Sequence, residues 1–179
     1  MIKINYDRRW DNVKSSLGER DAFVAALPGN TRYLANSESP PGTPPSSTMN
    51  YVVIPKKSEP FAITSSLEEH RCRHESSVKD IRCWTTYPDI KSDGKSALEI
   101  LKSSLKEIKA KQIFTDTKVS LGRSFKVSVS SNVNELRSIK SKAELQRIKK
   151  AIKQSDAGQM FAHNLVESGE GLSEKEVRS

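Results

Sequence analysis

Histidine and cysteine, the side chains best suited to bind zinc or to act as nucleophiles, come together at one place in this 179-residue sequence. The segment is His70-Arg71-Cys72-Arg73-His74, whose histidines, four residues apart, would share one face of a helix. Arg71 and Arg73 would place positive charge beside a cation, and the glutamate of the His-Glu-x-x-His motif is absent. Two interpretations stand: a structural or surface role, which the arginines favour, and a small metalloenzyme built on His70, Cys72 and His74.

The rest of the sequence offers little other catalytic chemistry. It contains no glycine-rich phosphate loop, nucleophile elbow or dinucleotide fingerprint. Cys72 lies beside two arginines and could be a low-pKa thiol, whereas Cys83 is expected to pack inside a strand. His163 precedes Glu167 by four residues, a spacing typical of a surface pair on a helix. We therefore expect no catalytic or cofactor-binding residues, and no metal ligands unless the histidine segment provides them.

Composition and charge indicate a single globular domain with an appended helix. Hydrophobic residues make up 35% of the chain and charged residues 29%, with a net charge of +8. The basic residues are dispersed, and their densest run, residues 137–153, lies on a helix with an apolar opposite face. This pattern favours a solvated helix face over a nucleic-acid or acidic-partner surface.

The same survey bears on the cellular compartment. No segment approaches the length of a membrane span, and the N-terminus lacks the apolar stretch of a signal peptide. Two cysteines are too few for a disulfide scaffold. We expect a cytoplasmic protein with no membrane association.

Short strands that alternate with helices predict an α/β layer structure. The expected strands are residues 22–27, 51–54, 61–64, 78–84, 112–115 and 125–130, with a turn at residues 28–30. In the last strand Phe125, Val127 and Val129 alternate with polar residues, which indicates a sheet edge or a half-exposed strand. The proline-rich residues 37–48 must form a loop, which could be a stiffened surface loop, a ligand for an aromatic groove or a contact with a partner subunit.

Three helices are expected to position these strands and to continue the chain. One covers residues 9–17, and one begins behind Ser96, with the apolar stripe Leu98, Leu101, Leu105 and Ile108. The capping box that begins at Ser141 starts the third, whose apolar stripe contains Leu145, Ile148 and Ile152. Gly169 and Gly171 are expected to end it.

A second capping box, from Ser173 to Glu176, is followed by only three residues. A helix that short is not stable in water. We therefore expect the natural chain to continue beyond Ser179.

The order of these motifs resembles the creatinase, prolidase and Xaa-Pro aminopeptidase family. The most specific part is the junction between that family's two domains, carried here by residues 136–141, Glu144, Leu145, Ile148, Ala151, Asp156, Ala157, Gly169 and residues 173–177. Weaker matches lie upstream: residues 8–17 resemble the family's opening helix, and residues 21–23 with Pro28, Asn30, Tyr33 and Leu34 resemble its first strand and Asn-x-x-Tyr-Leu turn.

The resemblance implies a non-catalytic N-terminal domain. It would have a three-layer α/β/α ribonuclease-H-like fold with a mixed sheet at residues 1–134, followed at 135–179 by a junction helix and the truncated start of a catalytic domain. In the family two aspartates, a histidine and two glutamates bind two divalent ions (manganese, cobalt or zinc) in the downstream pita-bread domain. None of these ligands maps onto this chain, so the chain alone is expected not to be an enzyme.

The implied role is dimerisation and control of access to the active site, with a homodimer partner or the catalytic domain as the contact. Trp84 or Tyr87 would match a family aromatic that reaches a neighbouring subunit's active site, although Trp84 could instead cap the core. Leu145, Ile148 and Ile152 would pack against the catalytic domain or self-associate. The alternative is a stand-alone peptide- or protein-binding module of the same fold.

Overall fold

The computed structural model describes residues 4–36, 49–168 and 173–175. The chain divides into a compact unit, Asn5–Ser138, and a second unit formed by Ile139–Ser179 with Met1–Ile4. The proline-rich segment 37–48, the two glycines at 169 and 171, and the end of the second capping box lie outside the described residues. Each unit is described by itself.

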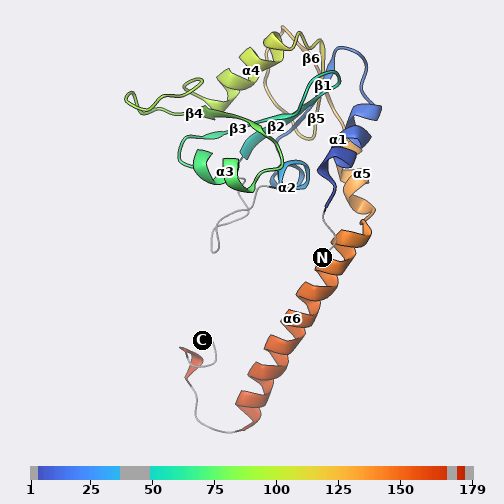
Figure 1. Ribbon diagram of the computed structural model, residues 1–179, viewed down its shortest axis with the longest axis vertical. Helices are drawn as coiled ribbons and strands as arrows, with labels where there is room; N and C mark the ends of the chain where they lie inside the picture. Colours follow the sequence, from blue (N-terminus) through green and yellow to red (C-terminus); the bar gives the residue numbers. More distant parts are fainter. Residues whose placement is uncertain (1–3, 37–48, 169–172, 176–179) are drawn as a thin grey trace. The chain divides into compact units, whose positions relative to one another are not determined.

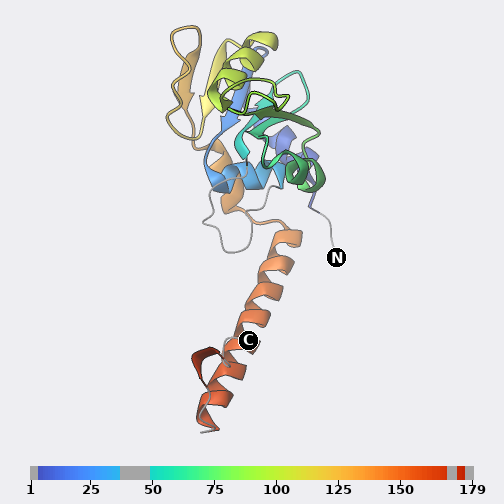
Figure 2. The same ribbon diagram turned by 90° about the vertical axis from the view of Figure 1, so that its left-hand side faces the viewer.

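A six-stranded mixed sheet forms the centre of the compact unit, in the order β4-β3-β2-β1-β5-β6. The strands are β1 (Asp21–Ala25), β2 (Met49–Pro55), β3 (Phe61–Ser65), β4 (Asp80–Trp84), β5 (Gln112–Thr115) and β6 (Lys126–Val129). Strand β2 is antiparallel to both β1 and β3, whereas the pairs β1 with β5, β5 with β6, and β3 with β4 are parallel. Strand β6 lies at one edge (Figure 2), as its alternating pattern predicted.

Helices cover both faces of the sheet (Figure 1). On one face lie α1 (Tyr6–Ser15), α2 (Pro28–Ala35), α3 (Glu69–Glu75) and α5 (Asn132–Ser138). The other face carries α4 (Ala97–Glu107). Each helix layer buries its own hydrophobic cluster against the sheet, which is the dominant stabilising contribution of such a structure. The predicted three-layer α/β/α arrangement with a mixed sheet is confirmed.

The start of α4 follows the local signals in the sequence. Ser96 caps this helix by accepting a hydrogen bond from the Glu99 amide. Leu101 and Leu105 are fully buried as expected, and Ile100 joins them although the predicted stripe did not include it.

Helix α2 replaces the turn expected at residues 28–30. Pro28 occupies the first helical position, where its fixed φ suits the helix and its missing N–H is not needed. The helix ends at Asn36, whose backbone is left-handed with φ of 59°. The Pro-Gly-Asn sequence therefore begins a helix here, and the expected turn is wrong.

The second unit consists of the helix α6 (Lys142–Glu167) and its short flanks. Ser141 and Glu144 form the predicted capping box, with both reciprocal hydrogen bonds present. The helix has a C-cap at Ser168. No helix among the described residues combines the length and apolarity needed to cross a bilayer.

Candidate functional sites

The two histidines of the sequence cluster lie on a helix face that Cys72 does not share. In α3 the rings of His70 and His74 are exposed, with centroids 4.9 Å apart. Cys72 is buried, and its thiol donates a 3.6 Å hydrogen bond to Thr64 Oγ1 in β3. Helix geometry thus directs Cys72 into the core and away from the histidines. Within the described ranges, no group of three or more histidine, cysteine, aspartate or glutamate side chains could hold a metal ion.

The arginines between the histidines pair with carboxylates along α3. Arg71 bonds Glu75 at 2.9 Å, and Arg73 bonds Glu69 at 2.8 Å, each four residues away. Such exposed pairs stabilise a helix by only about 0.3 to 0.5 kcal/mol each. Arg73 also donates a 3.1 Å hydrogen bond to the carbonyl of Ile81 in β4. These side chains support the short helix and attach it to the sheet.

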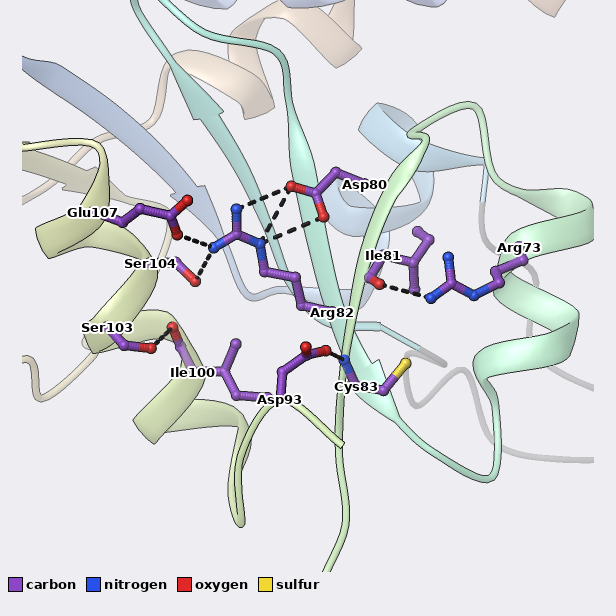
Figure 3. Close-up of polar contacts among 10 residues, drawn as sticks. All are labelled: Arg73, Asp80, Ile81, Arg82, Cys83, Asp93, Ile100, Ser103, Ser104 and Glu107. Carbon is purple, nitrogen blue, oxygen red and sulfur yellow. Dashed lines mark hydrogen bonds and ion pairs between the residues drawn. The ribbon is translucent and has the colours of Figure 1, made fainter. Parts of the chain in front are cut away.

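Cys83 is buried on the outer strand β4, where its backbone is covered by Asp93 (Figure 3). The Cys83 amide donates to Asp93 Oδ2 at 2.7 Å, and its carbonyl accepts from the Asp93 amide at 2.8 Å. Burial, reinforced by the charge of Glu69 and a hydrogen bond with it, raises the pKa of the Cys83 thiol to about 12. At neutral pH Cys83 is a packed thiol and not a nucleophile.

Arg82 forms the densest charged network of the close-up in Figure 3, and the sequence analysis did not identify it. Its guanidinium bonds Asp80 at 3.0 Å and both Glu107 and Ser104 at 2.7 Å. It also lies 4.4 Å above the centroid of the Phe61 ring. Because two of these partners belong to α4, the network fastens that helix to the end of the sheet.

Asp116 organises the opposite end of the sheet, directly after β5. The carboxylate is 8% exposed and accepts hydrogen bonds from the Ala26 and Leu27 amides at 2.9 and 3.1 Å. It also accepts a 2.9 Å bond from the Asn30 amide group. Asp116 therefore ties the segment that leads from β1 into α2, and the Asn30 side chain of α2, to the end of β5.

The same network reaches α5 through Arg137. The Arg137 guanidinium donates a 2.8 Å hydrogen bond to Asn30 Oδ1. Gly29 makes room for it, since a Cβ there would stand 2.9 Å from both guanidinium nitrogens. The chain of contacts therefore fixes α5 (Asn132–Ser138), which spans the predicted domain boundary after residue 134, to the compact unit.

The two aromatic candidates have different surroundings. Trp84 ends β4, lies half-buried against the α4-side cluster, and donates from its indole to Asn50 Oδ1 at 2.8 Å. Tyr87 is 57% exposed, on the segment between β4 and α4 that projects beyond the sheet (Figure 1). That segment returns to the strand end through a 3.1 Å hydrogen bond from the Thr85 amide to the Gly94 carbonyl. Trp84 is held in place, whereas Tyr87 presents its ring to solvent.

The predicted apolar stripe of α6 is exposed. Leu145, Ile148 and Ile152 are 45%, 43% and 53% exposed, and they recur at the spacing of one helix face. Farther along the helix, Met160, Phe161 and Val166 are exposed as well. This unit therefore carries apolar side chains that it does not bury itself.

Comparison with solved structures places this fold among Xaa-Pro peptidases. A Bacillus anthracis Xaa-Pro dipeptidase matches with a TM-score of 0.67 and 18% identity over 90% of this chain and 44% of its own. A Thermococcus sibiricus prolidase matches with a TM-score of 0.66 and 22% identity over 98% of this chain and 48% of its own. This chain thus spans less than half the length of these two proteins.

A shorter solved chain is matched almost completely. The Streptococcus thermophilus Xaa-Pro aminopeptidase chain is covered to 98%, against 74% of this chain, with a TM-score of 0.54 and 19% identity. No protein-family model and no curated protein sequence matches this chain. The resemblance found in the sequence is confirmed in the structure: this chain has the fold of a part, about half, of prolidase and Xaa-Pro dipeptidase chains.

Proposed function

We propose that this chain is the non-catalytic N-terminal portion of an Xaa-Pro aminopeptidase- or dipeptidase-like metallopeptidase. One observation carries the proposal: the fold likeness extends over 98% of this chain but only 48% of the Thermococcus sibiricus prolidase. A one-sided coverage of this kind is expected if the other half of such a protein forms a separate domain. The junction motifs from Leu136 onward, which resemble the family's domain boundary, support the same assignment.

Within such an enzyme, the chain would act in dimerisation and in control of access to the active site. Two exposed features support this role: Tyr87 and the apolar stripe of α6. Both offer apolar surface that another domain or subunit could cover. Two divalent ions, whether manganese, cobalt or zinc, would be bound by the other domain. The protein would act in the cytoplasm, whose reducing conditions keep thiols such as Cys72 and Cys83 free.

A stand-alone binding module of the same fold is the second candidate. The Streptococcus thermophilus match supports only its structural premise, that this fold can make up almost the whole of a solved chain. The coding sequence beyond Ser179 separates the two candidates. An in-frame continuation with two aspartates, a histidine and two glutamates in family order supports the peptidase, and a stop codon supports the module.

Hydrolysis assays test the non-catalytic assignment directly. The purified chain, supplied with manganese, cobalt or zinc, should leave Xaa-Pro dipeptides and peptides with N-terminal Xaa-Pro uncut, since the family's metal ligands do not map onto its residues. A full-length relative serves as the positive control for substrate and metal. Turnover that a chelator abolishes would refute the assignment.

A further inference from the structure

A pocket opens at the end of the sheet where β1 and β5 begin and β2 ends. It has a volume of about 310 Å³. Three segments line it: residues 19–21 before and at the start of β1, residues 55–58 at and after the end of β2, and residues 108–110 between α4 and β5. A volume of this order suits a small molecule.

Backbone hydrogen bonds hold the three segments together. The Lys56 amide donates to the Asp21 carbonyl at 3.0 Å, and the Lys111 amide donates to the Arg20 carbonyl at 2.8 Å. The Lys56 ammonium is fixed in turn by the Lys14 carbonyl at 2.9 Å. The backbone of the lining is therefore fixed before a ligand binds, whereas the exposed side chains of Arg20 and Lys109 would become ordered on binding.

Cations dominate the lining. Arg20, Lys56, Lys57 and Lys109 contribute four positive charges, against the carboxylates of Glu19 and Asp21. Glu19 pairs with Lys57, and this hydrogen bond and charge lower the pKa of the Glu19 carboxyl. Asp21 accepts a 2.8 Å hydrogen bond from the Gly18 amide. Among the described residues, neither Arg20 nor Lys109 forms an ion pair with a carboxylate.

Lys109 has a backbone conformation that is unfavourable for a residue with a side chain. Its φ is 53°, in the left-handed region that glycine usually occupies after a helix. The Lys109 and Ala110 amides close the end of α4 by bonding the Lys106 and Leu105 carbonyls at 2.9 and 3.0 Å. A glycine would satisfy this motif with less strain, so the turn itself does not require a lysine here. The Lys109 side chain adds a positive charge to the pocket lining.

We propose that this pocket binds the phosphoryl group of a small phosphorylated molecule, with Arg20 and Lys109 as its cationic contacts. A planar guanidinium and an ammonium group on the lining of one hollow offer several N–H donors to the acceptor oxygens of a phosphoryl group. The concave shape favours a small ligand over an extended polyanion, which would require a broad basic surface. This site belongs to the compact unit alone and is independent of any peptidase activity.

Calorimetric titration of the full chain with inorganic phosphate and with pyrophosphate, at constant ionic strength, tests the proposal. Pyrophosphate should bind more tightly than phosphate because it offers more oxygens to the same cations. Lys109→Gly and Arg20→Gln should each weaken binding about tenfold, the usual effect of losing a charged hydrogen bond. Glu19→Gln should strengthen binding, since it releases Lys57.

Two matched variants separate a site from general charge attraction. Lys91→Ala removes one exposed charge from the segment after β4, at the opposite end of the sheet, and should leave affinity unchanged. Lys109→Arg should keep binding. Lys109→Gly should melt at or above the wild-type temperature, so that its lost affinity is not lost folding. Three results would overturn the proposal. The first is no binding of pyrophosphate to the wild type at millimolar concentration, and the second is equal weakening of binding by Lys91→Ala and Lys109→Gly. The third is tighter binding of a polyanion such as heparin.

Discussion

Two roles were predicted for Trp84: capping the core and contacting a neighbouring subunit. The structure allows one substitution to distinguish them. The half-buried Trp84 ring packs against the α4-side cluster and its indole bonds Asn50, so Trp84→Ala should lower the free energy of unfolding by roughly 2 to 3 kcal/mol, less than the ~3 to 5 kcal/mol of a fully buried tryptophan. Urea denaturation followed by circular dichroism measures this change.

Tyr87→Ala is the matched control at the same end of β4. The exposed ring should contribute under about 0.5 kcal/mol to folding. If it lies in an interface, its loss should instead weaken association in sedimentation velocity. A Trp84→Ala protein as stable as the wild type would exclude the core-capping role.

Asp116 is expected to be the most sensitive polar residue of the compact unit. Asp116→Asn removes a buried charge and turns an amide group toward backbone donors, so stability should fall by roughly 2 to 3 kcal/mol. Chemical denaturation measures the loss, with Asp89→Asn in the exposed loop as control. If Asp116→Asn unfolds at the same denaturant concentration as the wild type, the carboxylate does not stabilise the segment that leads into α2.

At the scale of elements, α6 provides the test of association. Leu145→Lys with Ile148→Lys places two charges on the apolar stripe and should convert any dimer of the chain to a monomer in light scattering. Gln146→Lys with Gln154→Lys adds the same charge to other faces of the helix and should leave the assembly unchanged. A wild-type dimer that survives the first pair of substitutions must have its interface elsewhere.

Elements set by neighbouring residues could be predicted from the sequence, and those set by distant contacts could not. Ser96 and Ser141 cap helices whose signals span only four residues, so both helix starts were found. The residues that lead into α2 are held by Asp116, far away in the chain, so no local signal distinguished a helix at Pro28 from a turn. Helix α5 was missed for the same reason: Val133 is buried and Arg137 bonds Asn30, contacts that no local pattern reveals.

The candidate sites divide in the same way. Periodicity found the stripe of α6 because one helix carries it whole. The histidine cluster was a correct inference about one helix face, yet sequence spacing alone did not show that Cys72 points into the core. The basic pocket collects residues from three separate segments, so no local pattern in the sequence marked it.

At the scale of the whole molecule, the position of β1 determines when the sheet can be completed during synthesis. β1 pairs on one side with β2, which follows soon after it, and on the other with β5, which is translated much later. Until Gln112–Thr115 leaves the ribosome, the nascent sheet has an open, apolar edge at β1. The time between the synthesis of β1 and the synthesis of β5 is therefore the period of greatest exposure to aggregation. Slow translation or chaperone binding in that period would alter the yield of folded protein without changing a single native contact.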